Sequence, residues 1–229
     1  MSQPTGVHHL AISTKDMRGQ IEFFSQVLGI PLVGLFEMHG VPGGLHAFLA
    51  LDDTVFFSLV QLPGMFDVES TIGVTHAGSG AGVSAPGTMQ HLAFQVKSED
   101  ELLALRDRLR TNGIVVFGPL DHGMCRSIYF AGPEGLALEA AWSAGPMDHR
   151  MWIDPAVVEQ AGISTEQLAT FVDPPKFEQP DAPVPQPAID PSKPHLDYPP
   201  EQYAAMVTVP DDVITKSGSY PDPPVRLDG

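Results

Sequence analysis

The sequence predicts an α+β fold made of two βαβββ modules and a proline-rich C-terminal arm. The main observation is an internal repeat: "HLAISTKDMRGQIEFFSQVLGIPLVG", which starts at His9, recurs as "HLAFQVKSEDELLALRDRLRTNGIVVFG", which starts at His91. Each copy changes from a strand-length apolar run to apolar residues at helical spacing. The region beyond the second copy is rich in proline. Two homologous modules are the simplest explanation of the repeat.

Each repeat is predicted to begin with a strand and a helix. Asp16 is a good N-cap for the first helix, and Ser98 forms a capping box with Glu101 at the start of the second. Gly29 and Gly113 are predicted to end the helices, where a left-handed backbone is needed. The apolar residues at helical spacing are Ile21, Phe24 and Leu28 in the first copy and Leu102, Leu105 and Leu109 in the second.

Three further strands are predicted in each module. They are "PLVGLFEM", "LHAFLAL" and "TVFFSLVQL" in the first, and "IVVFG", "RSIYFA" and "LALEAAW" in the second. We predict module boundaries at residues 6–66 and 90–143, joined by a Gly- and Ser-rich linking loop at residues 67–89.

Residues 144–229 are predicted to form a proline-rich C-terminal extension with two short helices. Asp154 precedes Pro155 at the first helix start, and Ser164 forms a capping box with Gln167 at the second. A disordered tail is the alternative. Apolar anchors favour an arm wrapped on its own domain or on a partner subunit. These anchors are Trp152, Phe171, Phe177, Tyr198, Tyr203 and Tyr220.

Composition excludes several partners. The formal net charge of −16 and the scattered basic residues argue against binding to nucleic acid or to an anionic membrane surface. No segment has the continuous apolar length of a membrane span, and the first residues do not resemble a secretory signal. Cys125 is the only cysteine and cannot form an intramolecular disulfide, so a reducing, cytoplasmic location is expected.

Three residues suggest a metal site. His9 and His91 occupy the same place in the two modules, and pseudo-twofold packing of the modules is expected to bring them together around one cleft. Imidazole nitrogens that converge from two strands are suited to bind a metal ion. Glu139 lies among apolar neighbours in "LALEAAW", where a buried carboxylate needs a partner that a cation can supply.

With "HHLAI" opening one module, "QHLAFQV" opening the other and "GPEGLALE" closing the second, the chain resembles the vicinal oxygen chelate superfamily. That superfamily includes glyoxalases, fosfomycin and bleomycin resistance proteins, epimerases and extradiol dioxygenases. The resemblance covers roughly residues 6–143 and implies a curved mixed sheet around a metal cleft. It implies that His9, His91 and Glu139 are the metal ligands, and that His8 faces away from the metal.

The resemblance also shows departures. Glyoxalases take a fourth ligand from the last strand of the first module, where this chain offers only Ser58. Three ligands leave coordination positions open, and two histidines with one carboxylate are the set that non-haem Fe(II) oxygenases use.

The stretch "DHGMCRSIYFAGPEGLALE" resembles the part of extradiol dioxygenases in which a histidine and a tyrosine precede the glutamate ligand. His122 and Tyr129 match them and are the expected catalytic residues; structural roles in a turn and a strand are the alternative. A second catalytic histidine of those enzymes has no match on "DDTVFFSLV". His76 lies at a suggestive distance before His91, and His46 is interpreted as a structural residue near the cleft.

These features favour an Fe(II)-dependent, extradiol-type dioxygenase that acts on a small, catechol-like substrate with vicinal oxygens and uses dioxygen. The first alternative is a glyoxalase-like lyase, isomerase or epimerase in which Mn, Ni, Zn or Co acts as Lewis acid. The second is a ligand-sequestering resistance protein. A homodimer is expected, with the metal site formed within one chain or between two.

Overall fold

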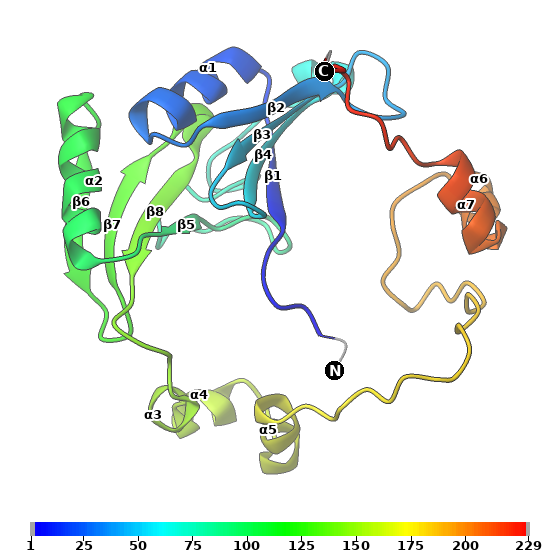
Figure 1. Cartoon of the computed structure of the whole chain (residues 1–229). Helices are drawn as coiled ribbons and strands as arrows, with labels where there is room; N and C mark the ends of the chain where they lie inside the picture. Colours follow the sequence, from blue (N-terminus) through cyan, green and yellow to red (C-terminus); the bar gives the residue numbers. More distant parts are fainter. Residues whose placement is uncertain (1–2, 228–229) are drawn as a thin grey trace. The chain divides into compact units, whose positions relative to one another are not determined.

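A computed structural model describes residues 3–227. Residues 4–174 form one compact unit, and residues of the two chain ends, 175–227 among them, form a second. Across the described residues, the longest and most apolar helices still fall short of what a membrane span requires. The candidate site lies entirely in the first unit, which Figure 1 shows with both sheets labelled.

The first predicted βαβββ module is confirmed. Its four strands form one mixed sheet in the order β1-β4-β3-β2, in which β1 and β4 are parallel and the other pairs are antiparallel. Its helix, α1, continues directly into a π-helical turn at Phe23–Val27. The elements are β1 (His9–Ser13), α1 (Met17–Glu22), β2 (Leu32–Glu37), β3 (Leu45–Ala50) and β4 (Phe56–Gln61).

The second module repeats this topology. Its sheet has the order β5-β8-β7-β6, again with one parallel pair, β5 and β8. The two sheets are separate four-stranded sheets, so the α+β class with two modules is confirmed. The elements are β5 (Leu92–Gln95), α2 (Glu99–Thr111), β6 (Val116–Asp121), β7 (Arg126–Ala131) and β8 (Ala137–Trp142).

The predicted helix signals act largely as expected. The Asp16 carboxylate accepts a hydrogen bond from the Gly19 backbone N–H at 3.0 Å. The Ser98 hydroxyl likewise accepts from the Glu101 N–H at 3.1 Å. The capping box is not reciprocal, however, because the Glu101 carboxylate accepts from the N–H of Lys97 instead. Gly29 and Gly113, after the two helices, have φ angles of +83° and +77°, which glycine adopts readily.

Short helices follow the second module. The two predicted ones are present as α4 (Pro155–Gln160) and α5 (Thr165–Val172), and the Ser164–Gln167 capping box is reciprocal. Three others were not predicted: α3 (His149–Trp152), α6 (Pro200–Thr208) and α7 (Asp211–Ser217). Where the proline-rich arm docks stays a prediction.

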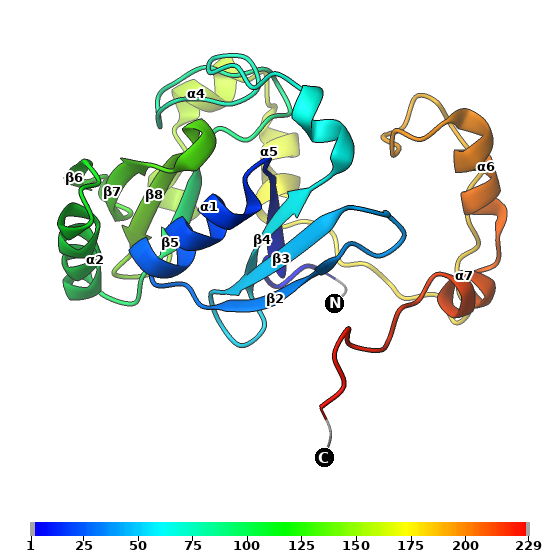
Figure 2. The same ribbon diagram turned by 90° about the horizontal axis from the view of Figure 1, so that it is seen from above.

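A single hydrophobic core joins the two modules. Fully buried Phe24, just after α1, packs against Phe57 on β4 and Phe94 on β5, with ring centroids 4.2 and 6.2 Å away. Leu102 and Leu109 of α2 are buried in the same core. Figures 1 and 2 show α1 against the first sheet and α2 against the second. Each sheet therefore turns its helix-covered face toward the shared core.

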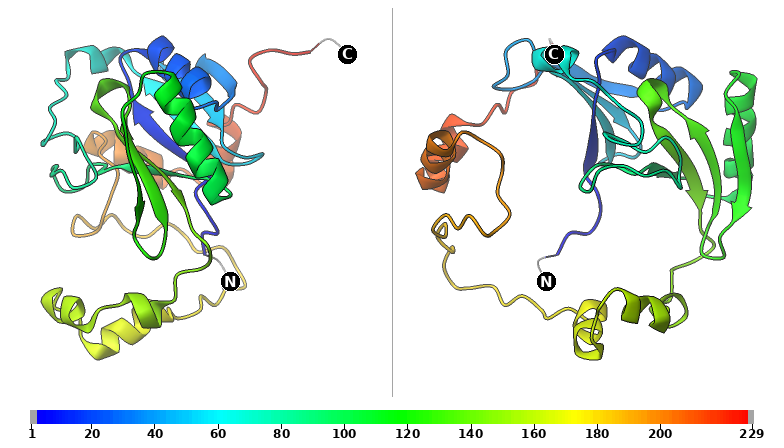
Figure 3. Two further views of the ribbon diagram at one scale, coloured as in Figure 1. Left: turned by 90° about the vertical axis from the view of Figure 1, so that its left-hand side faces the viewer. Right: turned by 180° about the vertical axis from the view of Figure 1, so that it is seen from behind.

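Polar contacts reinforce this packing of the modules. Arg108 of α2 donates from Nε to the Val27 carbonyl at 2.7 Å and from Nη2 to the Gln26 carbonyl at 2.8 Å. It thereby caps carbonyl groups at the end of the first helical segment. Figure 3 shows this end of α2 beside that segment. Glu134 of the second module accepts from the Gln20 amide at 2.7 Å, so the modules are joined at two points.

The shared core determines where the other sheet faces point. Side chains alternate along a strand, so residues between core positions lie on the opposite face. On β8, Leu138 and Ala140 are in the core, and Glu139 lies on the other face. On β1, Ile12 packs against the core. His9 is an odd number of residues away, so its side chain lies on the opposite face of the sheet. Because both sheets bury their helix sides together, the faces with His9 and Glu139 are both turned away from the core.

Candidate metal centre and ligand pocket

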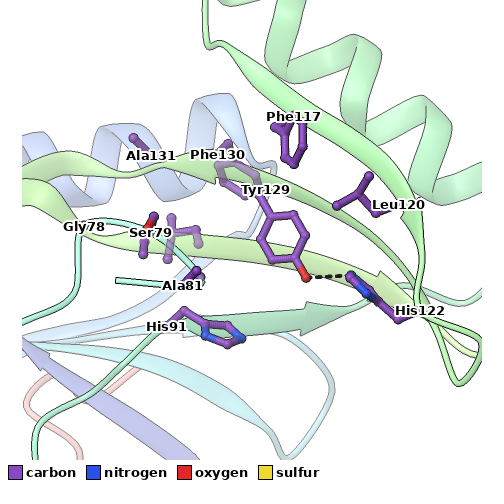
Figure 4. A pocket seen from close by; sticks show the side chains of 13 residues that line it. Gly78, Ser79, Ala81, His91, Phe117, Leu120, His122, Tyr129, Phe130 and Ala131 are labelled. Carbon is purple, nitrogen blue, oxygen red and sulfur yellow. Dashed lines mark hydrogen bonds between the residues drawn. The ribbon is translucent and has the colours of Figure 1, made fainter. Parts of the chain in front are cut away.

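A pocket of about 500 Å³ lies on the outer face of the second sheet. Strands β6, β7 and β8 form its floor, and a glycine-rich segment of the linking loop forms one wall. Figure 4 shows the side chains that line it. The lining residues are Gly78, Ser79, Gly80, Ala81, His91, Phe117, Leu120, His122, Tyr129, Phe130, Ala131, Ala137 and Leu138.

Two of the three predicted metal ligands meet beside this pocket. The Nε2 atom of His91 is 3.0 Å from Oε2 of Glu139. The Glu139 side chain is only 7% exposed, and that of His91 is 34% exposed. Glu139 is directly opposite Tyr129 on β7 and Ala93 on β5 in the strand register. The carboxylate is therefore buried with the imidazole as its neighbour, and the imidazole reaches the pocket.

Gln90 fixes which nitrogen of His91 carries a proton. The Gln90 amide nitrogen donates to the carbonyl oxygens of Ser79, Gly80 and Gly82 at 3.0–3.1 Å. The amide oxygen consequently faces Nδ1 of His91, which must donate to it. In the neutral ring Nε2 is then an acceptor, and it faces another acceptor, the Glu139 carboxylate. Such a pair needs a cation: a proton that makes imidazolium, or a metal ion.

The two predicted catalytic residues also lie together. The Tyr129 hydroxyl and Nε2 of His122 are 3.0 Å apart and hydrogen-bonded, as Figure 4 shows. Burial, and then the negative charge of Glu139, raises the pKa of the Tyr129 phenol, against a smaller lowering by the Ser127 hydroxyl. Tyr129 is thus a neutral hydrogen-bond donor on the pocket wall, next to a histidine that can exchange a proton with it.

The third predicted ligand is on a different surface. His9 is exposed on β1, with its Nδ1 atom 2.9 Å from Nδ1 of His8 and its ring 5.7 Å from that of Phe48. On the same sheet, Nε2 of His46 is 2.7 Å from the buried hydroxyl of Ser58. His8 is a neighbour of His9 in space as well as in sequence.

One chain does not assemble the predicted three-ligand set. Within residues 3–227, no three side chains of His, Cys, Asp and Glu lie close enough to hold a metal ion. The expectation that packing of the two modules brings His9 beside His91 therefore does not hold within a chain. The physical reason is the shared core, which turns the two ligand-bearing faces outward. His91 and Glu139 fit two donors of a metal site, and a third must come from elsewhere.

The contacts of two residues near these surfaces, Gln90 and His46, could not be predicted from the sequence. Gln90 contacts both the linking loop and His91; its signal in the sequence is a polar residue directly before the repeated histidine. His46 was interpreted as structural and Ser58 as a missing ligand, but strand pairing makes them one hydrogen-bonded unit. The pKa of His46 is lowered by burial, and then by its electrostatic interactions with His9 and His39.

Comparison with known sequences decides the family. A sequence profile of the glyoxalase/bleomycin resistance protein/dioxygenase superfamily matches residues 6–140. The chain belongs to this superfamily. The match covers both modules as far as β8 and ends just after Glu139. None of the curated proteins compared with the chain matches it.

Solved structures that match this superfamily member share little sequence with it. A glyoxylase/bleomycin resistance protein/dioxygenase domain from Frankia sp. EAN1pec is 16% identical, with a TM-score of 0.48, over 62% of this chain and 99% of that one. The fosfomycin resistance protein FosX from Listeria monocytogenes is 18% identical, with a TM-score of 0.42, over 65% and 99%. TnmS3, an antibiotic-binding protein from Streptomyces sp. CB03234, is 20% identical, with a TM-score of 0.42, over 63% and 99%.

Proposed function

We propose that this superfamily member is a divalent-metal-dependent enzyme whose ion is held by His91 and Glu139 of one copy and by His9 of a second copy. The observation that carries the proposal is the pair of facing acceptors, Nε2 of His91 and Oε2 of Glu139, 3.0 Å apart beside a pocket. A metal ion satisfies both lone pairs and offsets the cost of a buried carboxylate.

The two sheet faces point in directions that make a second copy necessary. His9 and the His91–Glu139 pair lie on faces that both point away from the shared core. Contact between the first-module face of one molecule and the second-module face of another brings the three ligands together without disturbing that core. By twofold symmetry, two such contacts make a closed homodimer with two sites.

The favoured chemistry is extradiol-type dioxygenation of a small, catechol-like substrate. Fe(II) bound by two histidines and one carboxylate would supply a redox-active centre with coordination positions left open for substrate and dioxygen. Phe117 and Leu120 offer an apolar surface for an aromatic ring, and the Tyr129 hydroxyl oxygen can accept a hydrogen bond from a substrate hydroxyl. His122, 3.0 Å from that hydroxyl, can accept the proton that a substrate hydroxyl releases through Tyr129.

The test is anaerobic reconstitution followed by two measurements. Purified apoprotein is titrated with Fe(II), and oxygen uptake is then recorded with a panel of catechols. We expect about one ion per chain, and oxygen uptake that is lost in His91→Ala and Glu139→Ala. His149→Ala, on α3 and outside the pocket lining, is the matched histidine control and should bind iron like the wild type.

Each contrary outcome has a defined meaning. Turnover of a carbonyl substrate without oxygen uptake, supported by Ni, Zn, Mn or Co, would replace dioxygenation by Lewis-acid lyase or isomerase chemistry at the same ligands. Tight binding of an aromatic ligand by protein that takes up no metal would identify a sequestering protein instead. Metal binding that survives both substitutions would overturn the ligand assignment.

A further inference from the structure

The glycine-rich segment at residues 78–82, the glycine loop, forms a wall of the pocket, and one side chain anchors it by hydrogen bonds to three of its carbonyl groups. Four of its residues line the pocket: Gly78, Ser79, Gly80 and Ala81. A Cβ atom added to Gly80 would lie 3.4 Å from the Tyr129 ring, so the loop backbone runs close to this aromatic side chain. A ligand that occupies the pocket therefore contacts or displaces the loop.

Gln90 is that anchor. Its amide nitrogen donates to three loop carbonyls: Ser79 at 3.1 Å, Gly80 at 3.0 Å and Gly82 at 3.1 Å. Carbonyl oxygens only accept, so this side of the amide must be the NH₂ group. The orientation of the amide is thus set by the loop.

The other side of the same amide faces His91. The Gln90 oxygen accepts from Nδ1 of His91, which leaves Nε2 as the nitrogen presented to Glu139 and the pocket. Histidine ligands generally donate their second ring N–H to a neighbouring acceptor, which fixes the tautomer and the ring orientation. One side chain therefore contacts the pocket wall with one end and a candidate metal ligand with the other.

We propose that Gln90 is a positioning residue that couples the glycine loop to the metal-binding nitrogen of His91. The inference rests on the proposed function for the role of His91 as a ligand. A closed loop holds the Gln90 amide in the orientation that presents Nε2, so closing of the loop strengthens metal binding. By reciprocity, a bound metal stabilises the closed loop by the same factor. A ligand that seats under the loop thereby tightens the metal site that it uses.

Two substitutions separate the two ends of the amide. Gln90→Glu keeps an acceptor for Nδ1 of His91 but removes the donor to the loop carbonyls and repels them. Gln90→Met, of similar size, removes both. Gln95→Glu, at the last residue of β5, makes the same charge change away from the glycine loop and is the matched control.

The experiment combines Co(II) affinity, measured spectroscopically on full-length protein, with hydrogen exchange of the loop amides with and without Co(II). In the wild type and in Gln95→Glu, Co(II) should slow exchange in the glycine loop by about tenfold. Gln90→Met should weaken Co(II) binding by about 10–100-fold and lose the protection. Gln90→Glu should still bind Co(II), but without protection of the loop.

The outcomes distinguish this inference from the proposed function. Co(II) binding by the wild type without any change in loop exchange would overturn the coupling and leave the metal site standing. If Gln90→Met bound Co(II) as tightly as the wild type does, the coupling would likewise be overturned and the metal site would stand. Failure of the wild type to bind Co(II) at all would overturn the proposed metal site and the inference with it.

Discussion

Glu139 is a carboxylate that the protein buries beside an imidazole, although a neutral side chain would be cheaper to bury. Such a cost is typical of functional sites, where removal of the costly group raises stability and abolishes function. We expect Glu139→Gln to leave the thermal stability of metal-free protein unchanged or higher. With a divalent metal at a hundred times its Kd, the free energy of unfolding of the wild type should rise by about 2.7 kcal/mol. The free energy of unfolding of Glu139→Gln should not change.

This expectation is measured by thermal unfolding with and without added metal, and Glu166→Gln on exposed α5 is the control for loss of a carboxylate. A metal-induced rise in Tm that survives in Glu139→Gln would show that the ion binds elsewhere.

His46 gives the first module a defined response to pH. Its pKa is lowered by burial and then by His9 and His39, so the unfolded chain binds this proton more readily than the folded protein does. Stability should therefore fall as pH decreases through the range below the ordinary histidine pKa. Between about pH 7 and about pH 5, we expect His46→Gln to lose less stability than the wild type, as measured by urea unfolding. Equal pH dependence in the two proteins would contradict this assignment.

Residues of the candidate site could be predicted from the sequence where a repeat or a motif singled them out. His91 and Glu139 were found in this way and do meet, as do His122 and Tyr129. The link made by Gln90 could not be predicted, because it depends on the path of a loop whose backbone carbonyls carry no sequence signal.

At the scale of elements, Phe24 joins the first helical segment to strands of both modules. The ring is fully buried, and its removal leaves a cavity where the modules meet. We expect Phe24→Ala to lower the free energy of unfolding by about 3–5 kcal/mol, as measured by urea denaturation. Phe66→Ala, at a ring that is 55% exposed, should change it by less than about 0.5 kcal/mol. Similar losses for the two variants would contradict the shared core.

Most elements were predictable because local and periodic signals agreed. Both βαβββ modules and helices α4 and α5 carry alternation, helical spacing or side-chain caps. Helices α6 and α7 lack such a signal: prolines occupy their N-cap positions, and neither has a side-chain cap. The proline-rich composition of this stretch predicted an extended chain, so these two helices were not predicted.

At the scale of the whole molecule, the sequence could not show which faces of the modules meet. Alternation along a strand is the same whether the helix sides or the opposite sides of the two sheets face each other. The structure shows that the helix sides meet, which separates His9 from His91 and Glu139 within a chain. The proposed homodimer follows from this arrangement.

The most direct test of this shared site is metal binding by mixed dimers of two inactive variants. His9→Ala and His91→Ala are co-expressed with different tags, so that random pairing makes about half of the dimers mixed. In a shared site, each mixed dimer contains one site with His9, His91 and Glu139 all intact. The mixture should then bind about a quarter of the Co(II) bound by the wild type, and each variant alone should bind none. A mixture that binds no more than the separate variants would contradict the account.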